Sequence, residues 1–167
     1  MTASNPAVVH ETPSLGDARL YLATAAMVLG NVLLPYAVHG IPGAGRALLP
    51  ILFFTLVAGW RYGLTAGLLT AVLSPLANHL LTGMPPAAML QTLILQGALL
   101  GVLAAATRGR RATLPLLALV VLAHQALTLA PSGAAAFGLF RLHAPAILLQ
   151  ILGGWALLRA LEPRREA

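Results

Sequence analysis

Long apolar runs, separated by short polar breaks, dominate the chain and predict a bundle of membrane-spanning helices. A helix needs about 20 apolar residues to cross a bilayer. Five runs come close to that length, at residues 20–38, 62–82, 87–106, 113–130 and 143–161. Transmembrane strands would alternate apolar and polar residues, whereas these runs are apolar throughout, and helices satisfy their own backbone groups in lipid. The expected fold class is therefore all-α, a polytopic membrane protein.

A sixth apolar run, residues 47–60, is the weakest predicted span. Its 14 residues would rise only about 21 Å as a helix, so it is either re-entrant or begins earlier, through Ile41-Pro42-Gly43. Counting this run as a span puts Arg46 and Arg141 on one side of the membrane and the other eight of the ten arginines on the opposite side. Because arginine is enriched in cytoplasmic loops, we predict six spans with both termini in the cytoplasm.

The composition agrees with a membrane domain. The chain is 59% hydrophobic and 8% charged, against about 25% charged residues in soluble domains. Its net charge of +6 does not indicate nucleic acid, because the arginines lie in breaks between apolar runs and lysine is absent. We expect a polar cytoplasmic tail over residues 1–17, one membrane domain over residues 18–161 and a charged cytoplasmic tail over residues 162–167. Residues 1–17 lack the basic start of a cleavable signal.

Catalytic chemistry finds little support in the sequence. Cysteine is absent, which excludes disulfides and thiolate catalysis. No carboxylate lies in a span, so paired acid and base groups are missing. His79, His124 and His143 lack metal-ligand spacing, and no glycine-rich loop with a lysine would bind ATP. We therefore expect no enzyme, no cofactor and no metal; a transporter would draw its energy from other subunits.

The polar side chains inside the spans suggest where a ligand would bind. They are few, and under the six-span topology most fall in the outer half: Asn31, Asn78, His79, Gln91, Gln96, His124, Gln125 and Gln150. Amides and imidazoles in an apolar pocket suit a polar, mostly uncharged ligand. Alternatively, each amide simply bonds to a neighbouring helix.

Two arginines on the outer side, Arg46 and Arg141, would bind a carboxylate or phosphate at the pocket mouth, or else contact lipid headgroups. Arg141 falls in a predicted loop, residues 131–142, whose Phe137 and Phe140 would cover a ligand or lie at the membrane interface. The predicted substrate-binding residues are Arg46, Asn78, Gln91, Gln96, His124, Gln125, Arg141, His143 and Gln150.

Small residues recur at helix-packing intervals in three spans. They are Gly63, Gly67 and Ala71, then Gly97, Gly101 and Ala105, and, in the first span, Ala23, Ala26 and Gly30. Small residues let helix backbones approach closely in a membrane. We predict internal packing for the first two sets, and docking of a partner protein on Ala23, Ala26 and Gly30.

The 38-residue stretch from Leu49 to Pro86, LPILFFTLVAGWRYGLTAGLLTAVLSPLANHLLTGMPP, is the most distinctive part of the chain. It resembles a phrase in the second and third spans of the substrate-binding S components of energy-coupling factor (ECF) transporters. The matching positions are Leu49, Pro50, Ala58, Gly59, Gly63, Gly67, Ser74, Pro75, Leu80, Leu81, Thr82, Gly83, Met84, Pro85 and Pro86. Chain length and the six predicted spans fit the same family over residues 18–161.

This resemblance implies a six-transmembrane-helix bundle of S-component type in the bacterial cytoplasmic membrane. Such a protein binds a vitamin or related micronutrient from outside, and it works with a transmembrane coupling protein and two ATPases. It implies docking through small residues on the first helix, here Ala26-x-x-x-Gly30 with Ala23 one turn before. The chain lacks the N-terminal histidine motif of the nickel/cobalt branch and the loop of the biotin branch, so no ligand residue carries over. A non-transporting membrane scaffold of cell-shape type is the alternative, and a small histidine-based membrane enzyme is a third interpretation.

Overall fold

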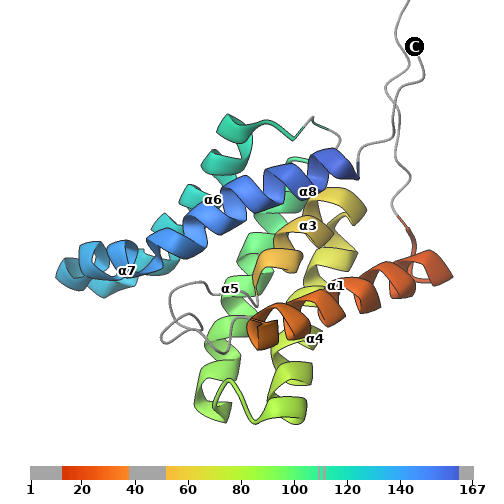
Figure 1. Cartoon of the computed structure of the whole chain (residues 1–167), viewed down its shortest axis with the longest axis horizontal. Helices are drawn as coiled ribbons and strands as arrows, with labels where there is room; N and C mark the ends of the chain where they lie inside the picture. The colour runs from red at the N-terminus through yellow and green to blue at the C-terminus, as the bar shows by residue number, and fades with distance from the viewer. Residues whose placement is uncertain (1–12, 38–51, 109, 111, 162–167) are drawn as a thin grey trace, which may run out of the picture.

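The chain folds into helices throughout the part that its structure describes. The structure is a computed structural model and describes residues 13–37, 52–108, 110 and 112–161. Within these ranges there is no strand, which confirms the all-α prediction (Figure 1). The elements are α1 (Ala18–Ala37), α3 (Phe53–Tyr62), α4 (Leu64–Thr82), α5 (Ala87–Ala106), α6 (Leu114–Leu129), the 3₁₀ segment η2 (Ala130–Ala135), α7 (Ala136–Leu148), the π-helical segment η3 (Leu149–Gly153) and α8 (Gly154–Ala160).

Four helical stretches are long and apolar enough to cross a membrane. They are Ala18–Pro35, Leu64–Thr82, Ala87–Ala106 and Leu114–Ala160, the last of which reverses direction at η2. Large apolar side chains point away from the bundle on all of them, as Leu22 (72% exposed), Leu95 (62%) and Leu119 (64%) show. Apolar surface on this scale suits lipid and is rare on soluble monomers. These helices are therefore compatible with a membrane protein.

Helix α3 lies at the centre of the bundle, in contact with α1, α4, α5 and α8. Seven of its 10 residues are buried, as expected for an apolar helix too short to cross a bilayer alone. Residues 47–51 of the predicted second span lie outside the described residues, so the structure does not establish six crossings. Arg61, in the predicted break between residues 47–60 and 62–82, lies instead in the last turn of α3. The chain breaks at Gly63, whose φ of 94° favours glycine.

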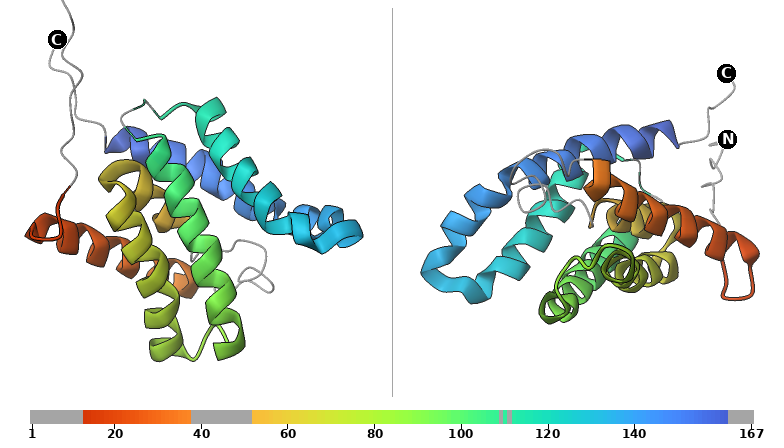
Figure 2. Two further views of the ribbon diagram at one scale, coloured as in Figure 1. Left: turned by 180° about the vertical axis from the view of Figure 1, so that it is seen from behind. Right: turned by 60° about the horizontal axis from the view of Figure 1, so that its bottom comes forward.

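Four glycines, Gly59, Gly67, Gly97 and Gly101, let α3, α4 and α5 approach closely. A Cβ atom on Gly59 would lie 2.6 Å from the carbonyl oxygen of Gly101, and one on Gly67 would lie 3.0 Å from the Cα of Gly59. A Cβ atom on Gly97 would lie 3.1 Å from the Cβ of Ala71. These contacts confirm the predicted internal packing for Gly67, Ala71, Gly97 and Gly101. Helices α4 and α5 run side by side as a hairpin (Figure 2).

One buried amide joins three helices. The side chain of Asn31 in α1 donates hydrogen bonds to the hydroxyls of Ser74 in α4, at 2.9 Å, and Thr55 in α3, at 3.3 Å. Its Oδ1 accepts a 2.9 Å bond from the backbone N–H of Phe54, one of the donors that the first turn of a helix leaves unpaired. With these three hydrogen bonds, Asn31 acts as a structural link between α1, α3 and α4.

The predicted loop at residues 131–142 is wrong in its second half. Pro131 and Gly133, whose φ is 53°, make the reversal within η2, and a continuous helical run then begins at Ala136, seven residues before the predicted start at 143. Ala134-Ala135-Ala136 favours a helix because alanine has the highest helix propensity. The tip of this second hairpin and the tip of the α4–α5 hairpin point in different directions (Figures 1 and 2).

Candidate functional site

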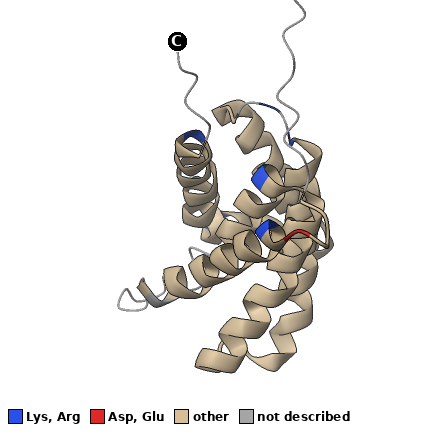
Figure 3. Ribbon diagram, turned by 90° about the vertical axis from the view of Figure 1, so that its right-hand side faces the viewer, with Lys and Arg blue, Asp and Glu red and all other residues tan. Residues whose placement is uncertain are grey.

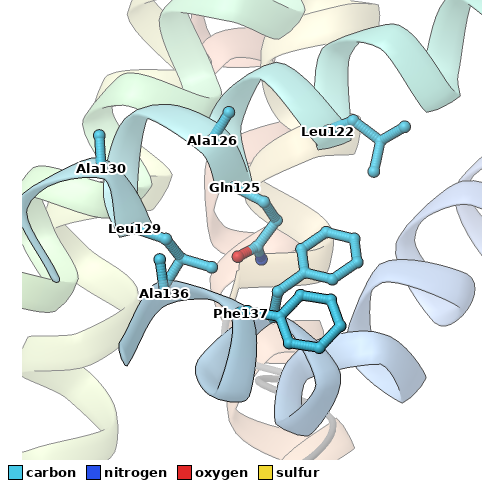
Figure 4. Close-up of a pocket in the computed structure, with 8 residues that line it drawn as sticks. Leu122, Gln125, Ala126, Leu129, Ala130, Ala136 and Phe137 are labelled. Carbon is cyan, nitrogen blue, oxygen red and sulfur yellow. The ribbon is translucent and has the colours of Figure 1, made fainter. Parts of the chain in front are cut away.

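A cavity of about 410 Å³ lies between α6 and α7. Its walls are Leu122, Gln125, Ala126, Leu129, Ala130, Ala136, Phe137 and Phe140 (Figure 4). Small-molecule sites have volumes of roughly 300–1,000 Å³ and combine mainly apolar walls with a few polar groups. This cavity has a comparable volume but is an open groove, since Phe137 is 70% exposed and Phe140 38% exposed, and Gln125 is its one polar wall residue.

Gln125 is turned inward by its position on α6. Val121 and Leu129, one helical turn before and after it, are both buried, and Gln125 itself is 2% exposed. Its amide points into the space between α6 and α7 (Figure 4). No group in the described part of the chain hydrogen-bonds to this amide. The amide faces the space between the two helices and is not paired within the described chain, so this position is suited to a polar ligand.

The neighbouring residue His124 faces the opposite way, toward α5. Its Nε2 lies 3.1 Å from the backbone carbonyl oxygen of Gln96, so Nε2–H is the donor. This bond fixes α6 against α5. Gln125, one residue further along α6, is thereby held facing α7. Of the two predicted polar residues on α6, His124 anchors the helix to α5 and Gln125 lines the cavity.

Arg141 lies on α7, one turn beyond Phe137, and not in a loop. Its guanidinium carbon is 5.5 Å from the centre of the Phe137 ring, a cation–π contact. All four acidic residues of the chain lie outside residues 18–161, at Glu11, Asp17, Glu162 and Glu166. No carboxylate of the membrane domain therefore competes for this guanidinium beside the cavity.

Gln150 is the most completely buried amide among the predicted substrate-binding residues that the structure describes. It is 0% exposed, and neither Nε2 nor Oε1 has a partner within the described ranges. It lies in the π-helical segment η3, a kind of distortion that is frequent at functional sites. Gly153 and Gly154, on the same side of this helix, pack against Phe53 and Leu56 of α3. Gln150 is therefore placed against the core and is not one of the residues that line the cavity.

The other predicted site residues lie at different places. Asn78 is buried near the end of α4, and Gln91 is exposed on α5. Gln96 and His143 are half-buried, and Nδ1 of His143 has no partner among the described residues. Arg46 lies outside the described residues. The structure therefore places Gln125 in the cavity wall together with Phe137 and Phe140, which we had expected in a loop, while Arg141 is exposed beside Phe137.

The predicted docking residues on α1 face different directions. A Cβ atom on Gly30 would lie 2.7 Å from the ring of Phe54, so Gly30 packs inside the chain. Ala23 is half-buried, and Ala26 is exposed together with Leu22 and Leu29. Of the three docking residues, Ala26 is the one that points fully outward.

Arginines gather at the end of the bundle opposite the cavity, which we call the arginine end: Arg61, Arg108, Arg110 and Arg159. Burial lowers the pKa of Arg108, and repulsion from Arg61 lowers it further, so the two cations are neighbours. The α4–α5 hairpin, at the bottom of Figure 3, carries no arginine. Helix α6 begins beside the arginine end and ends at the cavity, about 24 Å away along a 16-residue helix.

Metal chemistry gains no support from the geometry. The described residues hold no group of three or more histidine, cysteine, aspartate or glutamate side chains that would bind a metal ion. The site thus consists of an apolar cavity, one inward amide, two phenylalanines and a nearby guanidinium. Comparisons of the chain with protein-family models, with curated proteins and with solved structures give no match.

Proposed function

We propose that this protein is the membrane-embedded substrate-binding (S) subunit of an ECF-type importer. It captures a vitamin or related micronutrient on the outer face of a bacterial cytoplasmic membrane and delivers it inward with a coupling protein and ATPases. The observation that carries the proposal is the cavity between α6 and α7. Gln125 lies in its wall, is 2% exposed as a whole residue, and has no side-chain hydrogen bond to any described residue.

The distribution of arginine supports the orientation. The positive-inside rule assigns the arginine end to the cytoplasm. The cavity, at the far end of α6, then opens toward the outside, where an importer must take up its ligand. In this arrangement α3 belongs to the second of six crossings, and both termini are cytoplasmic.

The division of the bundle supports a binding role. The stretch that resembles S components includes α3 and α4, which pack against α5 through Gly59, Gly67 and Gly101. Such backbone contacts make a rigid unit, because no side chain lies between the helices to adjust its rotamer. The cavity belongs to the separate α6–α7 hairpin. A rigid unit beside a separate ligand-binding hairpin suits a protein that must hold its ligand and also bind a partner.

The outward face of α1 would dock the coupling protein. Ala26 is exposed there and is flanked by Leu22 and Leu29. A small residue between large apolar side chains allows a partner helix to approach closely. Gly30 does not take part directly, because it packs on Phe54.

Co-purification tests the proposal. The tagged chain is expressed with the ECF coupling protein and ATPases of its own bacterium, and we expect all subunits to elute together. Ala26→Leu should reduce the recovered coupling protein at least tenfold, whereas Ala156→Leu, at an exposed position of α8, should leave it unchanged. Failure of the unmodified chain to retain the coupling protein, with no small molecule found by native mass spectrometry, would contradict the proposal and favour the membrane scaffold.

A further inference from the structure

The walls of the cavity also indicate the chemistry of its ligand. We infer that the cavity between α6 and α7 binds a planar aromatic heterocycle that has a ring amide (lactam) edge and carries an acidic substituent. This inference rests on the proposed function, since it takes the cavity as the substrate site. It is argued from Gln125, Phe137, Phe140 and Arg141.

The lactam edge follows from Gln125. A glutamine amide presents an acceptor and a donor side by side. Gln125 is 2% exposed, and its amide has no bond to any described residue. A hydroxyl or an isolated carbonyl would pair with one half of the amide and, once bound, would cover the other half without pairing it. A ring N–H next to a ring carbonyl pairs with both halves at once.

The planar ring follows from the remaining walls. Phe137 and Phe140 come from α7, and Leu122 and Leu129 come from α6. Aromatic side chains favour stacked or edge-on contacts with another ring over contacts with an irregular aliphatic group. A volume of about 410 Å³ accommodates a ring system of two or three fused rings.

The acidic substituent follows from Arg141. Its guanidinium lies 5.5 Å from the centre of the Phe137 ring, beside a wall of the cavity. No aspartate or glutamate occurs between residues 18 and 161, so the membrane domain itself supplies no carboxylate partner. A ligand carboxylate or phosphate at this point would bind the guanidinium through two parallel hydrogen bonds.

A lipid acyl chain is the competing occupant, because an open apolar groove in a membrane protein contacts lipid. An acyl chain would fill the space between the leucines and phenylalanines. It would leave the amide of Gln125 without a partner and would give Arg141 nothing to bind at the level of the ring. The polar residues therefore favour the heterocycle.

Binding of three related probes to the full chain in lipid nanodiscs tests the inference. The first probe is carbostyril, a bicyclic aromatic lactam, bearing a carboxylate. The second is its O-methylated form, which lacks the ring N–H and carbonyl pair, and the third lacks the carboxylate. By equilibrium dialysis we expect the first probe to bind about tenfold more tightly than either of the others. The second probe lacks the paired hydrogen bonds to Gln125, and the third lacks the charged contact with Arg141.

Two variants assign these preferences to residues. Gln125→Leu should abolish the difference between the lactam and its O-methylated form, and Arg141→Gln should abolish the effect of the carboxylate. Thr92→Val, at an exposed position of α5, serves as the control and should change neither. Thermal unfolding of each variant establishes that the protein is folded.

Equal binding of the lactam and its O-methylated form to the unmodified chain would overturn the inference, as would displacement of every probe alike by added phospholipid. These results are distinguishable from failure of the proposed function. If the coupling protein binds while the lactam preference is absent, the ligand class is wrong and the proposed function stands. If the preference is present and depends on Gln125 while no coupling protein binds, the ligand class stands and the importer is wrong.

Discussion

The carboxamide nitrogen of Asn31 in α1 lies 2.9 Å from the hydroxyl oxygen of Ser74 in α4 and donates a hydrogen bond to it. Both residues are 0% exposed, and the same amide also bonds to Thr55 and to the backbone of Phe54. One side chain thus satisfies three groups that would otherwise be buried without partners. This link holds α1 against the helices that carry the S-component resemblance.

Asn31→Ala is expected to destabilise the protein strongly. The substitution leaves the Phe54 N–H and two hydroxyls without their partner, and a loss of about 2–4 kcal/mol in the free energy of unfolding follows from about 1–3 kcal/mol for each unsatisfied group. Ser74→Ala removes one bond only and should lose about 1 kcal/mol. Reversible unfolding in mixed micelles measures both. Additive losses in the double variant would contradict the direct bond, because paired groups give non-additive effects.

Gly59→Ala and Gly138→Ala are expected to change stability in opposite directions. A Cβ atom on Gly59 would lie 2.6 Å from the backbone oxygen of Gly101, so α3 and α5 must move apart. Such overpacking destabilises by about 1–3 kcal/mol. A Cβ atom on Gly138 meets nothing within 4 Å, and alanine in a helix interior is favoured over glycine by up to about 1 kcal/mol. Thermal unfolding in detergent compares the two; equal midpoints would show that the glycine contact is not tight.

The hairpin of α4 and α5 could be predicted closely from the sequence because its ends carry strong local signals. The predicted spans were residues 62–82 and 87–106, and the helices are Leu64–Thr82 and Ala87–Ala106. Gly63 and Gly83 have positive φ angles, which end a helix readily. The turn with Pro85 and Pro86 follows. The glycines and prolines at these ends therefore predict the helix boundaries that the structure has.

The start of the last helix could not be predicted in the same way. Pro131 and Gly133 suggested a longer loop, whereas the alanines that follow favour a helix, and η2 and α7 pack against α6. The cavity depends on that helix, because it brings Phe137 and Phe140 opposite Gln125. Gln125 itself was predicted from its depth in the membrane. Its phenylalanine neighbours were assigned to a loop, and the role of Asn31 depends on contacts between three helices that no local pattern reveals.

Gln150→Met is expected to stabilise the protein. Both amide atoms of Gln150 are buried without a partner in the described part of the chain, and removing an unsatisfied buried amide gains about 1–3 kcal/mol. Methionine has a similar length and adapts its shape to a packed site. Unfolding in mixed micelles should show a higher free energy for the variant. A clear loss of stability would mean that the amide is hydrogen-bonded in the folded protein, and would remove Gln150 from the candidate ligand residues.

Single cysteines should report the orientation of the bundle without interference, because the chain contains no cysteine. Thr113→Cys lies at the start of α6 near the arginine end, and Ala134→Cys lies in η2 beside the cavity; both positions are exposed. The arginine excess assigns Thr113 to the cytoplasm and Ala134 to the outside. A membrane-impermeant maleimide added to intact spheroplasts should therefore label Ala134→Cys and not Thr113→Cys. After lysis, Thr113→Cys should be labelled as well.

Because the 16 residues of α6 separate the two positions, labelling of both before lysis would show that this helix does not cross the membrane. Labelling of Thr113→Cys alone would place the cavity on the cytoplasmic side, where it would be unable to receive a ligand from outside.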